Sequence, residues 1–503
     1  MHDRARAWPL VRRPVDLVRL AAGWLALVLL AGAGAPAAPA APAEAPKLRP
    51  LPAELQRRMP ELVREAELYR GLKLERRVPW GRVSEPELRR EVIAEFREDL
   101  PPRRLAEVEL GLKAFGLIPE SMDLGSYVPE LLTSQIAGFY DPHRKSLAVV
   151  DRPGGLLGRE AGAQVGTEMA RKMEDGLLVH ELTHAIQDQH FDLDHLSDPD
   201  PLSDGGVARL ALVEGDATLV MMDGLVGARL EDVPEGPGLV NELMTAGGDE
   251  EAPAAGKGMP GQREIASAPA WFRDQLLFSY SRGAAFCLEV RRRGGQKLLD
   301  YAFAVDPPRS SEQILHPEKW FGHRDDPVVI AWPDLGRELP GHAKAAEGQL
   351  GEEGIAVLLR PVLPDAAQAA AAAAGWGGDR FAVYQQAGRR LLAWIADWDT
   401  EEAAARFQAA ASRLGAGWTV VRAAPRRVTV LRGDLEAATR AAVLARLAAA
   451  RAEPPANHDI DLARLGVRPE PAAPAATRPP GAPAATPAAP PPAAPPRFTP
   501  PAT

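Results

Sequence analysis

The spacing of apolar residues predicts helices in the first part of the chain. Over residues 51–116, apolar side chains recur every three or four positions, which is the period of an amphipathic helix. Ser84 and Glu87 fit a helix-capping pair, with Pro86 in the first turn. The same apolar period returns over residues 206–229, so a further helix is expected there.

Strands are predicted where short β-prone runs are bounded by turn residues. Residues 136–140 and 146–150 flank the turn sequence DPHR and predict a β-hairpin. Residues 376–450 twice repeat two strands followed by a helix, with the helices expected to start at Asp399 and Asp434. The expected fold class is therefore α+β, with a mainly helical core that contains a small sheet, and a small C-terminal ββαββα unit.

Composition divides the chain and predicts export. Five arginines precede an apolar run at residues 20–30, and small residues follow it. This is the layout of a secretory signal peptide, with an uncleaved N-terminal membrane anchor as the alternative, so a periplasmic or extracellular location is expected. A Pro/Ala-rich C-terminal tail cannot pack a core. The expected parts are the signal or anchor with its linker, the main domain, the small α+β unit and the tail, at residues 1–46, 47–365, 366–452 and 453–503.

The charge balance disfavours nucleic acid as a partner. The chain has 68 acidic and 59 basic residues and a formal net charge of -9, without a long basic block beyond the extreme N-terminus. Its single cysteine, Cys287, excludes an internal disulfide and a thiolate zinc site, and its apolar neighbours favour a buried position. Any metal must therefore be bound by histidine and carboxylate side chains.

The segment VHELTHAIQDQH, residues 179–190, carries the candidate chemistry. Helical positions four apart share a face, so His180 and His184 can bind one metal ion while Glu181 reaches a water on that ion. Zinc with three protein ligands keeps a fourth position for water and lowers the pKa of that water to about 7, and Glu181 can accept the proton. The alternative is a pair of surface histidines on an ordinary amphipathic helix.

The third metal ligand has two candidates. His190 follows His180 by ten residues, as in the metzincin pattern, but Gln187 replaces the glycine at which the chain must turn. If the helix continues, His190 points away from the pair. Glu214 lies in the later helical stretch, from which a second helix can supply a carboxylate, and Gly215 beside it would allow close helix approach.

Aspartates around this region offer further candidates. Asp216 or Asp223 could accept a hydrogen bond from the ring N–H of a ligand histidine, although plain solvation is the favoured interpretation of Asp216. The connection over residues 189–205 is rich in aspartate and could bind calcium, but a solvated loop is favoured there.

Five segments together resemble a family of exported bacterial gluzincin-type zinc metallopeptidases in the thermolysin-like clan, many of them uncharacterised. The segments are GFYDPHRKSLAVV, LLVHELTHAIQDQHFDLD, ALVEGDATLVM, FSYSRGAAF and PPRSSEQILHPEKW, within roughly residues 60–360. The resemblance implies a zincin-like core with Zn²⁺ on His180, His184 and Glu214. It further implies that Glu181 is the general base and that a strand within residues 137–150 pairs with an extended peptide.

Peptide hydrolysis at such a site also needs a donor to the oxyanion, usually tyrosine or histidine. Tyr280 and His316 are the downstream candidates, with simple packing and a turn before Pro317 as the respective alternatives. The expected function is a zinc-dependent peptidase acting on a peptide or protein substrate. A catalytically inactive zincin-fold protein that binds peptides or assembles the envelope is the alternative. The sequence leaves open the oligomeric state, and whether residues 47–120 are a scaffold or a propeptide.

Overall fold

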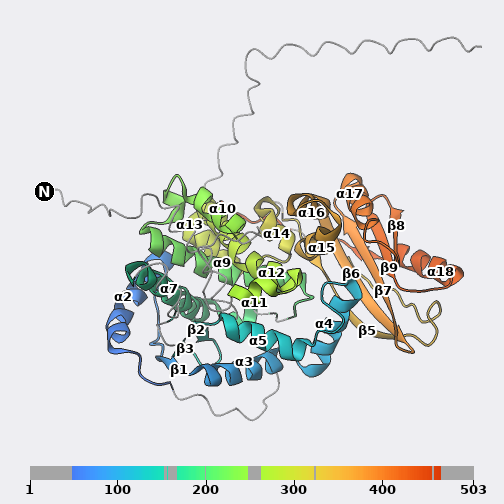
Figure 1. The fold of residues 1–503 in the computed structure, drawn as a ribbon. Coiled ribbons are helices and arrows are strands. Elements are labelled where there is room, and N and C mark those ends of the chain that lie inside the picture. The colour runs from blue at the N-terminus through green and yellow to red at the C-terminus, as the bar shows by residue number, and fades with distance from the viewer. Residues whose placement is uncertain are drawn as a thin grey trace, which may run out of the picture.

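The computed structural model describes residues 48–151, 156, 167–196, 198, 200–246, 262–321, 324–455 and 458–465. The predicted signal peptide or anchor, its linker and the Pro/Ala-rich tail from residue 466 lie outside these residues. No helix in the described part of the chain is both long and apolar enough to cross a membrane. The described residues form an α+β fold, as the sequence predicts (Figure 1).

Four helices form the centre of the N-terminal part. α7 (Thr167–Phe191) packs against α9 (Asp204–Val226), and α9 packs against α13 (Gly283–Ala304). The helix α2 (Ala53–Arg70) lies against both α7 and α9. The helix expected over residues 206–229 is thus confirmed as α9. The other helical segments are α3 (Glu85–Asp99), α4 (Pro102–Phe115), α5 (Leu124–Gln135), α8 (Leu193–Leu196), η1 (Leu230–Asp232), α10 (Gly236–Ala246), α11 (Gln262–Ser267), α12 (Ala270–Leu277), the π-helix η3 (Phe278–Arg282), α14 (Ser311–Leu315), η4 (Pro317–Lys319), α15 (Gly351–Leu359), η5 (Arg360–Val362) and α16 (Ala366–Ala373).

A three-stranded sheet lies beside α7. It contains β1 (Trp80–Val83), β2 (Gly138–Asp141) and β3 (Ser146–Val150) in the order β1-β3-β2. β2 and β3 are antiparallel and confirm the predicted hairpin, although its first strand starts two residues later than expected. The capping pair is also confirmed, because Ser84 and Glu87 hydrogen-bond reciprocally at the start of α3.

A five-stranded antiparallel sheet forms the C-terminal part, in the order β5-β6-β7-β9-β8 (Figure 1). The strands of this sheet are β5 (Ala343–Gly348), β6 (Trp376–Gln386), β7 (Arg389–Trp398), β8 (Trp418–Ala424) and β9 (Arg427–Arg432). The helix α17 (Glu401–Ala411) follows the β6-β7 hairpin, and α18 (Ala437–Ala448) follows the β8-β9 hairpin. A separate small pair contains β4 (Val329–Ile330) and β10 (Ala452–Glu453). The ββαββα order is confirmed. Thr400 rather than Asp399 caps α17, and α18 starts at Ala437 rather than Asp434.

The two parts share hydrophobic cores instead of meeting at a simple linker. β5 pairs with β6 although it lies before the expected boundary at residue 366. The helix α4 packs across the same sheet, where the ring of Phe115 contacts those of Phe381 and Trp394 edge to face, with centroids 4.9 and 5.2 Å apart. The helix α4 is therefore part of the hydrophobic core of the C-terminal sheet.

Candidate metal centre

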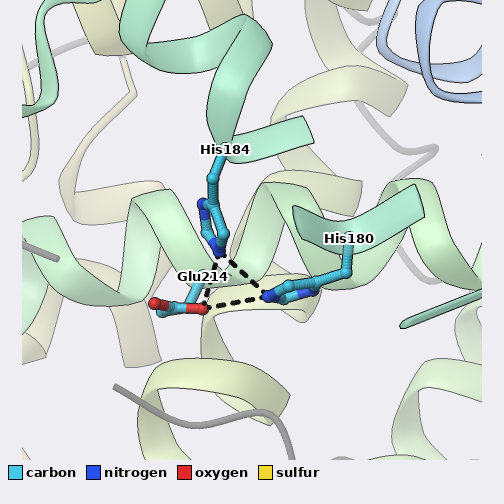
Figure 2. Close-up of side chains that lie close together, drawn as sticks. All are labelled: His180, His184 and Glu214. Atoms are coloured by element: carbon cyan, nitrogen blue, oxygen red, sulfur yellow. Dashed lines mark hydrogen bonds and ion pairs between the residues drawn. The ribbon is translucent and has the colours of Figure 1, made fainter. Parts of the chain in front are cut away.

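Three buried side chains converge between α7 and α9 (Figure 2). The Nε2 atoms of His180 and His184 lie 3.2 and 3.3 Å from the same carboxylate oxygen of Glu214, and 3.0 Å from each other. The two histidines come from successive turns of α7, and Glu214 comes from the facing turn of α9. The helix pair thus brings two imidazoles and one carboxylate oxygen to a common point.

The spacing of these three atoms matches one face of a zinc tetrahedron. Nitrogen and oxygen ligands about 2.0–2.1 Å from zinc, at tetrahedral angles, lie about 3.3 Å from one another. The three distances between His180, His184 and Glu214 are 3.0 to 3.3 Å. Two imidazoles and a carboxylate are also a donor set that zinc uses in catalytic sites. The residues present therefore fit zinc with one coordination position left over.

Without a metal ion, His184 and Glu214 stabilise each other as an oppositely charged pair. Burial by itself lowers the pKa of His184, but the Glu214 carboxylate outweighs it and raises this pKa to about 9. Burial raises the pKa of Glu214, yet the histidines overcome that effect and hold it well below its ordinary value. Burial lowers the pKa of His180. The oppositely charged His184 and Glu214 thus lie where a metal cation could bridge them.

Glu181 lies beside β2, the edge strand of the three-stranded sheet. Its carboxylate accepts the backbone N–H of Tyr140 at 2.8 Å, and burial raises its pKa to about 8. The N–H of Val150 donates to the carbonyl of Ala137, so alternate residues of β2 face β3. Gly138 and Tyr140 therefore present their backbone groups to the other edge. The candidate base therefore lies beside the backbone edge of β2 that faces away from β3, and the residues of this strand are buried.

Two facing glycines allow α9 and α13 to approach closely. A Cβ atom on Gly215 would lie 2.1 Å from the carbonyl carbon of Gly283, and one on Gly283 would lie 2.0 Å from the carbonyl oxygen of Ala211. Only glycine fits at either position without separating the helices. This confirms the expectation that Gly215 permits close approach, and it places the start of α13 and the preceding π-helix against the Glu214 turn.

Gly283→Ala is expected to destabilise the protein by about 1–3 kcal/mol, because its methyl group would overlap the backbone of α9. Thermal unfolding of the variant measures this loss. Gly238→Ala on α10 is the matched control, since a Cβ there has no atom within 4 Å. Equal unfolding temperatures for the two variants would show that α9 and α13 can separate without cost.

The two oxyanion-donor candidates lie in different surroundings. The ring of Tyr280, in the π-helix, stacks against that of His180 with centroids 6.0 Å apart, so Tyr280 lies at the metal centre. His316 ends α14 and hydrogen-bonds the buried carboxylate of Glu352 at 2.9 Å, a contact that raises the pKa of His316. The ring of His316 is thus held by Glu352, and its role as an oxyanion donor stays a prediction.

The structure does not bring His190 to the other two histidines. α7 continues as a helix through Phe191, because Gln187 replaces the glycine at which a turn would be needed. His190 is consequently rotated away, and its Nε2 lies 2.8 Å from the carbonyl oxygen of Lys73. The metzincin arrangement is not the one this chain adopts.

The two candidate aspartates lie in different surroundings, and Asp216 is not solvated as the sequence suggested. Asp216 is fully buried rather than solvated, and it accepts a hydrogen bond from Gln187 at 2.8 Å. Asp223 is not near a ligand histidine, because it pairs with Arg291 at 2.8 Å and accepts the N–H of Leu230. Asp216 therefore belongs to the surroundings of the metal centre, whereas Asp223 joins α9 to α13.

Sequence reasoning missed Gln187 and Arg70, both of which lie close to the centre. Gln187 is three residues after His184 on the same helical face and hydrogen-bonds its ring, a spacing that could have identified it. Arg70 lies 2.6 Å from Asp216 but belongs to α2, more than 100 residues earlier in the chain. No local pattern could have pointed to it.

Other candidates elsewhere in the described structure already have partners. Cys287 is buried as expected, and burial raises its pKa. A second group of carboxylates surrounds the ammonium group of Lys319, a cation of the chain itself: these are Glu312, Asp325 and Asp399. The aspartates of the connection after α7 lie beside separate basic groups: Asp194 with His143, Asp198 with Arg209 and Asp200 with Arg104. Among the described residues of that connection, no group suited to calcium is found.

Comparison with known proteins informs only the C-terminal part. Residues 337–452 match a family model described as a domain of unknown function (DUF8575). The match begins before β5 and ends at β10, so it includes all five strands of the C-terminal sheet and excludes the metal centre. No curated protein and no solved structure matches the chain.

Proposed function

We propose that the protein is a zinc-dependent peptidase with His180, His184 and Glu214 as metal ligands. The observation that supports this proposal is the triangle of ligand atoms, whose sides of 3.0 to 3.3 Å suit tetrahedral zinc. Zinc bound there would polarise a peptide carbonyl and acidify a water in its fourth position. The buried location lowers the local dielectric, which strengthens both effects.

The residues around the metal have complementary roles in this proposal. Glu181 accepts a proton from the attacking water and later delivers it to the leaving amine, because it is buried next to the ligand His180 on the same helix. Tyr280 orients and shields His180, on whose ring it stacks, and is the candidate donor to the oxyanion. In this proposal Glu181 transfers the proton, and Tyr280 stabilises the negative charge that develops on the peptide oxygen.

The substrate proposed for this site is an extended peptide or an unfolded segment of protein. The edge of β2 presents backbone groups at Gly138 and Tyr140, the latter already hydrogen-bonded to Glu181. A peptide added antiparallel or parallel to this edge would pass the metal centre and would be recognised mainly through its main chain. The arginine-rich and apolar N-terminus supports a place of action outside the cytoplasm.

Zinc binding by single-ligand variants tests the ligand assignment. Wild type is expected to bind one zinc ion, and His180→Ala and Glu214→Ala to bind it roughly two orders of magnitude or more weakly, because each removes one of three protein ligands. Competition with a chromophoric chelator measures the affinity. His190→Ala is the matched control and should bind zinc like wild type. Loss of binding in His190→Ala with retention in Glu214→Ala would contradict the assignment.

A further inference from the structure

Gln187 joins the metal centre to a buried ion pair. Its Oε1 lies 2.9 Å from Nδ1 of His184, while its Nε2 donates to the carbonyl of Val213 at 3.0 Å and to the carboxylate of Asp216 at 2.8 Å. Both N–H groups and the oxygen of this amide therefore have specific partners. The side chain is completely buried, so water does not replace any of them.

These contacts determine which nitrogen of His184 carries hydrogen. The Val213 carbonyl and the Asp216 carboxylate can only accept, so they fix the amide nitrogen of Gln187 on their side. The amide oxygen must then face His184, where it can only accept a hydrogen bond from Nδ1–H. In a neutral imidazole, hydrogen on Nδ1 leaves Nε2 with a lone pair, and Nε2 is the atom that faces Glu214.

Arg70 places a positive charge beside Asp216. Its Nε lies 2.6 Å from the same oxygen of Asp216 that accepts from Gln187, and both side chains are fully buried. Its guanidinium carbon also lies 5.4 Å from the ring centroids of Phe191 and Phe303. A buried carboxylate without such a partner would take up a proton and could then donate instead of accept.

We propose that Arg70, Asp216 and Gln187 are positioning residues that hold His184 in its Nδ1–H form, ready to bind metal through Nε2. This inference rests on the proposed function of the site. It also gives α2 a permanent role, because Arg70 is the last residue of that helix. The segment over residues 53–70 is therefore part of the working metal centre and not a removable propeptide.

Two substitutions of Gln187 separate positioning from packing. Gln187→Leu removes the acceptor for Nδ1–H and is expected to weaken zinc binding about 10- to 100-fold. Gln187→Glu keeps an acceptor at that place but loses the donors to Val213 and Asp216, and is expected to weaken zinc binding less than Gln187→Leu does. A packing role predicts the reverse order, because leucine suits a buried position and a second carboxylate beside Asp216 does not.

The measurements are chelator competition for zinc and the visible absorption spectrum of the cobalt-substituted full-length protein. Gln187→Leu should shift the cobalt bands more than Gln187→Glu does. Thermal unfolding of the metal-free variants records any change in stability separately. Gln189→Leu is the matched control, since Gln189 lies on the same helix but hydrogen-bonds the backbone of Arg76 instead.

The outcomes distinguish this inference from the proposed function. If wild type binds zinc and Gln187→Leu matches it in affinity and cobalt spectrum, the positioning role is wrong and the ligand assignment stands. If wild type binds no zinc, both fail. Mass spectrometry of exported, zinc-containing protein provides a further test of α2: its N-terminus is expected before residue 53, and an active species that begins after residue 70 would overturn the role of Arg70.

Discussion

Glu181→Gln is expected to lower the rate of casein hydrolysis by about 10²- to 10⁴-fold, which is the usual contribution of a general base. Glutamine has nearly the same shape, and its amide oxygen can still accept the N–H of Tyr140 that Glu181 accepts at 2.8 Å. It cannot accept a proton from water. The fold and the three ligand side chains should remain in place, so zinc stoichiometry and affinity should equal those of wild type.

The control for this experiment is Glu168→Gln, which changes an exposed glutamate at the start of the same helix. Its hydrolysis rate should match that of wild type. If wild type binds zinc but cleaves neither casein nor a broad panel of unfolded proteins, the peptidase proposal fails. A catalytically inactive protein that binds peptides along β2 would then account for the metal centre.

The features that local periodicity determines were the ones the sequence could predict. The hairpin of β2 and β3, the helices α7 and α9, and the pairing of His180 with His184 all follow from spacings of two, three or four residues. Glu214 could be proposed because it lies on a helix that follows α7 closely in the chain. Each of these inferences needs only the geometry of one element or of two successive elements.

Features that depend on distant packing could not be predicted in this way. β5 pairs with β6 in the C-terminal sheet, and α4 packs against that sheet. The sequence of neither element indicates which distant segment it contacts. His316 was a candidate because it is a histidine downstream of the motif, but the buried carboxylate of Glu352 determines where its ring lies. The sequence around Asp216 is compatible with an exposed aspartate, whereas the structure buries it beside Arg70 from the distant helix α2.

The interpretation of Asp216 shows how one long-range contact changes several local ones. Without Arg70, a buried aspartate on an apolar stretch of α9 would be costly, and solvation was the simpler prediction. With Arg70 in place, the buried carboxylate has a cationic partner and accepts a hydrogen bond from Gln187, whose amide then orients His184. The packing of α2 on α7 and α9 is thus linked to the protonation state of a metal ligand.

Arg70→Met is expected to lower the free energy of unfolding by about 3–5 kcal/mol, because it leaves the Asp216 carboxylate buried without its cation. Methionine keeps much of the apolar contact with Phe191 and Phe303, so lost packing contributes little. Urea unfolding of metal-free protein measures the effect, since bound zinc would add its own stabilisation. Arg64→Met, at an exposed position of the same helix, should change stability by less than about 0.5 kcal/mol.

The double variant Arg70→Met with Asp216→Leu distinguishes two causes of the lost stability. One is the unpaired charge on Asp216, and the other is the loss of packing contacts made by the Arg70 side chain. Removing both members of a buried ion pair is often neutral or stabilising, and the carboxylate of Asp300, the other partner of Arg70, is 29% exposed and can be solvated. Most of the stability lost in Arg70→Met should therefore return, while Gln187 keeps its hydrogen bond to Val213 at 3.0 Å. If the double variant is as unstable as Arg70→Met alone, the loss comes from missing contacts of the arginine side chain, and the carboxylate of Asp216 does not depend on Arg70.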